Sequence, residues 1–455
     1  MSHHVAPPLL HKALLLEFAV CAGPLPFAFF FGRFAAGGLS FIGLLLAWLV
    51  YHALRKEPFH FTCLIASSIP LLVFVRGAFI PFNSLIVLLS WGLLAAALAR
   101  AQFSGFWRRK TLLFTIVGSV AFWWVSFLRS GNYESNLRAL EWSFSAAVVF
   151  MLSERRSYLY TAMLGWGISV VTAGMMLLPY GDRLGMADID GVTLGNPILL
   201  GLPAALVLLL SIADQGRWLL LDGYPSLRAL LGCIWGLFLV FSTSRGSWIV
   251  ALVGLLILFI FERRTRIPMA AFGLLLGLGM FAFASSSHMQ FARHYLWKTI
   301  SPDVALASKT TGRSEQWQAF PAVLGDSPVW GFGPGSGRAV AYAYSGANLQ
   351  WHSVYLQVGA EMGILGLTVL FLLLGILIRN GIKHFADYDE IVPLLGTLGF
   401  MMYGLSVSGF DSLGGILLGL GFLGGHRSNL WIVRRERFHV VAVCSTAHGL
   451  RRVDA

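Results

Sequence analysis

The feature that most constrains this chain is a series of apolar runs of about 18 to 25 residues, separated by short charged or Gly/Pro-rich segments. A helix of that length crosses the hydrocarbon core of a bilayer, where every backbone polar group must find an internal partner. With 57% hydrophobic and 12% charged residues, the 455 residues do not fit a soluble enzyme or a disordered chain. We therefore predict an all-α polytopic membrane protein.

Dividing the chain at its charged and Gly/Pro-rich breaks predicts about 12 to 14 transmembrane helices. The predicted spans lie near 12–32, 36–53, 59–77, 82–100, 111–129, 135–152, 157–178, 195–214, 225–243, 246–262, 267–285, 352–378, 391–408 and 412–425.

The short loops between these spans alternate in their content of Lys and Arg. With the N-terminus inside, the cytoplasmic loops hold clusters such as 108–110 and 263–266, whereas the opposite short loops hold mostly single arginines. Cytoplasmic loops of multi-pass proteins carry such an excess, so we expect both termini to be cytoplasmic. The net charge of +12 is thus divided among loops and does not indicate a nucleic-acid partner.

Four regions follow from this segmentation. We predict N-terminal transmembrane helices over 1–285, a large outer loop over 286–351 that caps the bundle, C-terminal transmembrane helices over 352–428 and a basic cytoplasmic tail over 429–455. Within the loop, Thr311 is expected to cap a short amphipathic helix from Ser314 to Leu324. A Gly-rich stretch over 331–338 lacks the ending of a phosphate-binding loop, and we interpret it as a turn.

His352 is the strongest candidate for chemistry, because it lies where the large loop meets a long apolar helix. It is either an interfacial histidine that caps the helix or a group that holds or passes a proton at the membrane edge. Glu361, nine residues later, would lie about 13 Å deeper on a regular helix and face away from His352. We expect Glu361 to contact another helix, although an ionisable residue within a span is also a site candidate.

Two arginines are candidates for binding a phosphate or diphosphate. Arg245 lies at the outer end of a tight helical hairpin, and Arg313 opens the short helix of the large loop, where backbone N–H groups also favour an anion. The alternatives are a snorkelling residue at a helix end for Arg245 and a solvated loop residue for Arg313. Arg183 and Arg338 are further possible phosphate contacts. The four cysteines are scattered, and the acidic pair Asp188 and Asp190 does not by itself indicate a metal site.

Several of these motifs together resemble the O-antigen ligase and polymerase superfamily. They are Ser-Arg-Gly at 244–246, Thr-Gly-Arg-x-x-x-Trp at 311–317, Gly-Phe-Gly-Pro-Gly at 331–335 and His-Ser-x9-Gly-x-x-Gly at 352–366. The last spacing looks like the signature of the ligases, with Leu367 where Thr or Val is usual.

The resemblance implies a GT-C-like helical bundle in the bacterial inner membrane, with an active site on the periplasmic side. Such a protein moves a glycan from undecaprenyl diphosphate to an acceptor hydroxyl with inversion, and it needs neither a cofactor nor a metal. In that reaction His352 is the catalytic residue, and Arg245 and Arg313 bind the diphosphate.

The acceptor is left open by the sequence. It is lipid A–core in a ligase, a second lipid-linked glycan in a polymerase or a protein hydroxyl in an O-oligosaccharyltransferase, and the His-Ser-x9-Gly spacing favours the ligase. A polytopic lipid or solute transporter is the alternative from a different class. It predicts charged residues near the bilayer midplane and inverted repeats, whereas the charged residues of interest lie at the outer interface.

Overall fold

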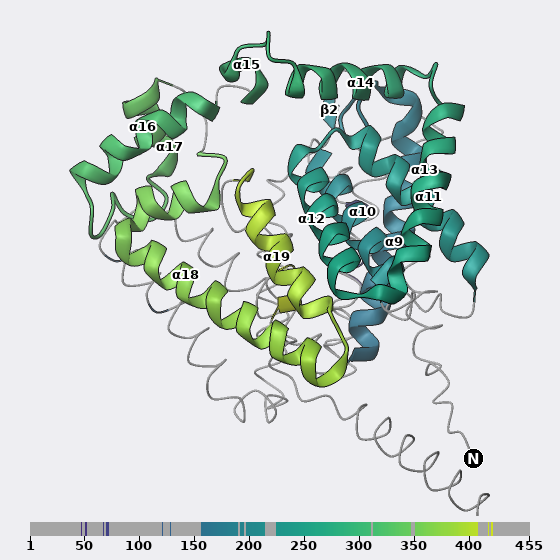
Figure 1. The fold of residues 1–455 in the computed structure, drawn as a ribbon. Coiled ribbons are helices and arrows are strands. Elements are labelled where there is room, and N and C mark those ends of the chain that lie inside the picture. Colours follow the sequence, from purple (N-terminus) through teal and green to yellow (C-terminus); the bar gives the residue numbers. More distant parts are fainter. Residues whose placement is uncertain are drawn as a thin grey trace, which may run out of the picture.

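The computed structural model describes mainly residues 156–189, 192–194, 197–213, 224–310, 313–346 and 351–407, which form helices and one small hairpin (Figure 1). Four of the described helices are long and apolar enough to cross a membrane, and three apolar helices are shorter. The long ones are α9 (Arg156–Leu177), α11 (Pro225–Ser242), α13 (Arg266–Ala282) and α18 (Val354–Tyr388), and the shorter ones are α10 (Pro197–Ile212), α12 (Arg245–Phe261) and α19 (Val392–Gly404).

The prediction of an all-α multi-pass membrane protein is thus confirmed. The seven helices coincide with the seven spans expected between 157 and 408, except that the helix expected to end near 378 continues to Tyr388. The spans predicted before 153 and over 412–425, and the tail over 429–455, lie outside the described residues apart from isolated positions.

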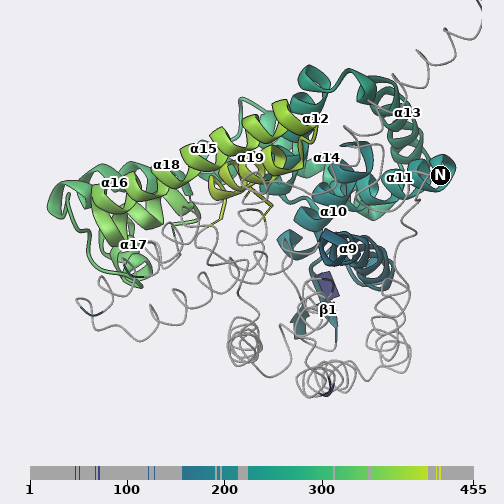
Figure 2. The same cartoon turned by 90° about the horizontal axis from the view of Figure 1, so that it is seen from below.

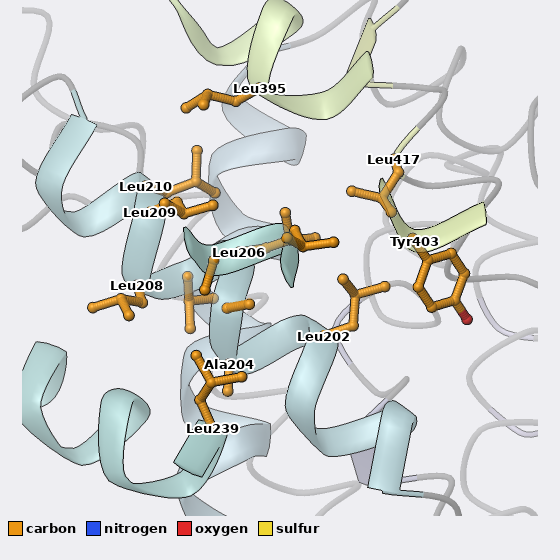
Figure 3. Close-up of a cluster of buried hydrophobic side chains, with 14 of the residues drawn as sticks. Leu202, Ala204, Leu206, Leu208, Leu209, Leu210, Leu239, Leu395, Tyr403 and Leu417 are labelled. Atoms are coloured by element: carbon orange, nitrogen blue, oxygen red, sulfur yellow. The ribbon is translucent and has the colours of Figure 1, made fainter. Parts of the chain in front are cut away.

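Helix α10 forms the centre of the helical block, the name we use for α9 to α13. Its sequence is apolar on every side, and 15 of its 16 residues are buried. A helix that is hydrophobic all round is stable only when neighbours cover it on all sides. Helices α9, α11 and α12 pack against it, and side chains of α19 join the same apolar cluster (Figure 3).

Small residues let α9 and α11 approach closely. Gly167 and Gly174 are seven residues apart on α9, and a Cβ at these positions would lie 2.8 Å from the Trp235 ring and 2.5 Å from the Phe238 ring. The Trp235 indole N–H donates to the Gly167 carbonyl at 3.2 Å. Glycines that admit a large side chain of the neighbouring helix are typical of membrane bundles.

Short elements cover one end of the block. Strands β1 (Ala187–Ile189) and β2 (Val192–Leu194) form an antiparallel hairpin, the one departure from helix among the described elements. The residues between the strands are Asp190-Gly191, a pair that favours two-residue hairpin turns. Helix α14 (Ser287–Ile300) lies across the end of the block, followed by α15 (Leu306–Thr310) (Figure 1). The segment between α9 and α10 and the large loop predicted over 286–351 therefore meet at the same end.

A second unit, which we call the cap lobe, consists of α16 (Arg313–Asp326), α17 (Gly337–Ser345) and residues 354–362 of α18. Figure 2 shows α16, α17 and α18 extending away from the helical block. The lobe has its own small apolar cluster of Val323, Val340, Ala341, Trp351 and Ala360. The short helix predicted from Ser314 to Leu324 corresponds to α16. The expected cap, Thr311, lies outside the described residues, and the Ser314 N–H donates to the Thr310 hydroxyl at 3.1 Å.

Helix α18 is broken at Gly363, which has φ 63° and ψ −159°. This conformation is open essentially to glycine alone. The break admits the segment that follows α16, because the N–H of Ile364 donates to the Pro328 carbonyl at 2.8 Å and that of Leu365 to the Val329 carbonyl at 3.3 Å. The first part of α18 therefore belongs to the cap lobe and the second part to the membrane region.

Candidate active site

Arg245 is held at the tip of the hairpin that joins α11 to α12. Helix α11 ends at Ser242, Thr243 takes a left-handed conformation with φ 48°, and α12 begins at Arg245. Ser242, Ser244 and Ser247 are buried beneath the tip. They fill the space left by Gly201 of α10, where a Cβ would lie 2.6 Å from the Ser242 hydroxyl. Close packing on α10 thus determines where the Arg245 side chain leaves the helix.

Arg183 reaches the same tip from the segment between α9 and α10. Its Nε donates to the Ser242 carbonyl at 3.2 Å, and its Nη2 donates to the Thr243 carbonyl at 3.3 Å. The neighbouring Leu184 N–H donates to the Phe241 carbonyl at 3.1 Å, which fixes the loop on the hairpin. Arg183 and Arg245 therefore lie side by side although they are 62 positions apart in the sequence.

Tyr295 of α14 lies against both guanidinium groups. The Cζ atoms of Arg183 and Arg245 are 5.5 Å and 5.0 Å from the centre of its ring. Cations within about 6 Å of an aromatic ring are attracted to its electron-rich face. Sequence reasoning missed this residue. The signal for it was the four-residue spacing from Phe291 within a helical stretch, which places two aromatic rings on one face.

Arg313 brings a third positive charge from the first turn of α16. Burial lowers the pKa of its guanidinium, and the positive charges of Arg245 and Arg183 act in the same direction. Arg245 also donates to the Lys309 carbonyl, just before α16. The structure thus brings Arg183, Arg245 and Arg313 together from three separate segments. Such a concentration of guanidinium groups can bind a diphosphate through several charge-assisted hydrogen bonds.

His352 lies beside this arginine cluster, which we define as Arg183, Arg245 and Arg313. It precedes α18 by two residues and has φ 50°, a left-handed conformation that is uncommon for residues other than glycine. The preceding Trp351 is fully buried and packs edge-on against Phe320, with 5.8 Å between ring centres. The backbone therefore anchors His352 on the cap lobe and leaves its ring partly exposed.

The electrostatic surroundings of His352 favour the neutral imidazole. Burial lowers its pKa to about 4, and the positive charge of Arg313 acts in the same direction. At neutral pH the ring therefore keeps an unprotonated nitrogen that can accept a proton. An unprotonated histidine next to several fixed positive charges is available to accept a proton close to a bound anion.

Glu361 is buried and contacts a different helix. Its carboxylate accepts the N–H of Gly337, the first residue of α17, at 3.1 Å, and it also accepts a hydrogen bond from the Gln357 amide. The predicted separation of His352 and Glu361 assumes that both lie on one regular helix. Since α18 begins at Val354, that geometry does not hold. Glu361 instead acts on the Gly-rich segment.

The Gly-rich segment over 331–338 forms a turn, as interpreted from the sequence. Gly331, Gly333 and Gly335 all have positive φ angles. The N–H groups of Phe332 and Gly333 donate to carbonyls of α18 at 2.9 and 2.8 Å. These two amides therefore fasten the turn to α18. Arg338, the last residue of this stretch, is exposed on α17.

Neither acidic pairs nor metal sites add to this arrangement. Within the described ranges no group of three or more His, Cys, Asp or Glu residues is placed to hold a metal ion. Asp188 lies in strand β1, and Asp190 lies outside the described residues.

Comparison with known proteins adds one match. Residues 229–371 match the family model described as O-antigen ligase. The matched stretch runs from α11 into α18 and includes Arg245, Arg313 and His352. No curated protein matches the chain.

Proposed function

We propose that the chain is a glycosyltransferase that moves a glycan from undecaprenyl diphosphate to a hydroxyl of lipid A–core. The match of residues 229–371 to the O-antigen ligase family model supports this proposal. The reaction takes place on the periplasmic side of the bacterial inner membrane. The observation that carries the proposal is the convergence of three guanidinium groups with a neutral histidine at one end of the membrane helices.

The arginine cluster suits a donor that is already activated. A sugar linked to a diphosphate carries its own leaving group, so the enzyme has to position the donor and stabilise the charge that develops on the leaving oxygen. Arg245 and Arg313 bind the diphosphate, and Arg183 is within reach to assist them. Guanidinium groups supply this charge without a nucleotide or a metal ion, and we propose that the reaction uses neither.

His352 acts on the acceptor. Its unprotonated ring nitrogen takes the proton of the acceptor hydroxyl while the oxygen forms a bond to the anomeric carbon. The bond from that carbon to the diphosphate oxygen breaks, and its electron pair leaves with undecaprenyl diphosphate. A single displacement of this kind inverts the configuration at the anomeric carbon.

Transfer with purified components tests the proposal. The full chain in detergent is incubated with undecaprenyl-diphosphate-linked glycan and lipid A–core, with EDTA and without nucleotide. We expect glycan on lipid A–core with the wild type, and a rate lower by about 10² to 10⁴ with His352→Ala. His294→Ala is the matched control, because His294 is exposed on α14 and stacks on Trp297.

Other products would identify other members of the superfamily. Glycans that lengthen on their own carrier would identify a polymerase, and glycan on an added protein acceptor would identify an O-oligosaccharyltransferase. If folded protein that binds the donor forms none of these products, the transferase proposal is wrong, and transport of lipid or solute is the function to measure next.

A further inference from the structure

We propose that Tyr295 is a positioning residue, which holds the guanidinium groups of Arg183 and Arg245 next to each other so that both can engage one diphosphate. This inference rests on the proposed function and extends it to a residue outside the sequence motifs. It starts from one observation, namely that both guanidinium groups lie within cation–π distance of the same ring.

Two adjacent guanidinium groups repel each other, so an attractive contact is needed to hold them side by side. They carry the same charge. Burial lowers the pKa of Arg183, Tyr295 opposes this effect, and the positive charge of Arg245 lowers the pKa further. Without a ligand, repulsion favours conformations in which the groups separate. An aromatic ring attracts both cations and offsets part of this repulsion. Tyr295 thereby keeps a site for two negative charges ready before the donor arrives.

The ring of Tyr295 is held by its neighbours. Trp248 packs edge-on against it, with 6.4 Å between ring centres and an interplanar angle of 84°, and Phe291 stacks on it at 6.1 Å. The Trp248 indole N–H donates to the Leu239 carbonyl at 2.9 Å. Since Trp248 lies one turn after Arg245 on α12, the same helix supplies both the arginine and the aromatic group that orients the tyrosine.

Arg183 and Arg245 are also connected to different parts of the molecule. Arg183 is bonded to the hairpin carbonyls of Ser242 and Thr243, whereas Arg245 is bonded to the Lys309 carbonyl after α14. Tyr295 contacts both side chains. A purely structural role, in which Tyr295 only packs α14 on the block, would affect stability and leave donor affinity unchanged in the folded protein.

Donor affinity distinguishes the two roles. The full chain is purified in detergent, and its binding of undecaprenyl diphosphate without a glycan is measured for the wild type, Tyr295→Phe and Tyr295→Leu. We expect Tyr295→Phe to bind within about twofold of the wild type, because it keeps the ring. We expect Tyr295→Leu to bind about tenfold more weakly.

Trp297→Leu provides the matched control. Trp297 lies on the same helix, is 55% exposed and stacks on His294, so the same kind of substitution removes an aromatic ring that does not face the arginines. This variant should bind like the wild type. Thermal unfolding of all variants in the same detergent shows whether a loss of binding follows from loss of the fold.

A double-mutant cycle tests whether Tyr295 acts through Arg183. In an Arg183→Ala background, Tyr295→Leu should weaken binding by clearly less than in the wild type, because one of the two cations it positions is gone. The inference would be overturned if Tyr295→Leu weakened binding equally in both backgrounds, or if folded Tyr295→Leu bound like the wild type. It would also be overturned if Tyr295→Phe and Tyr295→Leu lost binding equally, or if the wild type did not bind the lipid diphosphate. A wild type that binds the lipid diphosphate but transfers no glycan would instead contradict the transferase and leave the role of Tyr295 intact.

Discussion

The helical block and the cap lobe are held together in different ways. The block has one continuous apolar cluster, with α10 buried on all sides. The cap lobe has a separate cluster of five buried residues, and its part of α18 also contributes Val354, Val358 and Met362 to the large cluster. Hydrogen bonds join the Gly-rich turn to α18 and α18 to the segment after α16. Each unit contributes to the candidate site, because Arg245 belongs to the block and Arg313 and His352 belong to the cap lobe.

The two units therefore position different residues of the candidate site. The block positions Arg245, the proposed diphosphate contact, by close packing of buried serines against Gly201. The cap lobe positions His352, the proposed base, by backbone hydrogen bonds that depend on a few glycines and one buried carboxylate. Changes in the block should therefore act on donor binding, whereas changes in the cap lobe should act on the catalytic step through His352 and on donor binding through Arg313.

The largest effect is expected for Arg245→Ala. Loss of a guanidinium group that stabilises the leaving diphosphate should lower kcat/KM by about 10² to 10³. Arg245→Lys should recover only part of this, because an ammonium group cannot bind bidentately. Steady-state transfer rates over a range of donor concentrations provide the measurement, with exposed Arg293→Ala of α14 as control. If Arg245→Ala had the kcat/KM of the wild type, the helical block would not contribute to the site through Arg245.

Gly363→Ala should destabilise the cap lobe by about 3 kcal/mol or more, because the backbone conformation is open only to glycine. A Cβ there would also lie 2.4 Å from the Val329 carbonyl oxygen. A Cβ at Gly375 on the same helix would have no other atom within 4 Å, so Gly375→Ala should be neutral or slightly stabilising. Thermal unfolding compares the two variants, and equal stability would mean that the break in α18 is not required.

The pH profile of transfer should reflect the neutral state of His352. A base acts in its unprotonated form, so a pKa lowered to about 4 keeps kcat/KM level at neutral pH and lets it fall about tenfold per pH unit below 4. Arg313→Gln removes a positive charge that lowers this pKa and should move the acid limb to higher pH. An acid limb near pH 6.5 in the wild type would show that His352 is not held neutral in this way.

Glu361→Ala should loosen the start of α17 by about 1 to 3 kcal/mol, since it leaves the buried Gly337 N–H without its carboxylate acceptor. Glu361→Gln keeps an acceptor oxygen of the same reach and should have a smaller effect. Hydrogen exchange over residues 337–341 measures the change directly. If exchange rises equally throughout the block, the cap lobe is not an independent unit.

The smallest effect is expected for Arg338→Ala. Arg338 is exposed on α17, and the positive charges that act on Arg313 come from Arg245 and Arg183. Transfer should stay within about twofold of the wild type, as is usual for exposed positions. A tenfold loss would add Arg338 to the diphosphate site and extend that site onto the cap lobe.

Much of the fold was predictable from apolar periodicity, because a run of about 20 apolar residues has few other structures open to it. The break at Gly363 was not, since it depends on carbonyls from Pro328 and Val329, more than 30 positions earlier. Arg245, Arg313 and His352 were identified as candidates from residue type and motif. Their convergence and the contact of Tyr295 with two arginines depend on tertiary packing, which no local pattern encodes.

The break at Gly363 also bears on how the protein is made. The membrane part of α18 begins with N–H groups that are bonded to the Pro328 and Val329 carbonyls instead of to a preceding helical turn. The large loop is synthesised before this helix, so its segment after α16 must fold back onto the helix before the membrane part of α18 has a completed first turn. An epitope tag or protease site inserted after α16 should therefore impair the membrane integration of α18, even though the insertion lies outside the predicted spans.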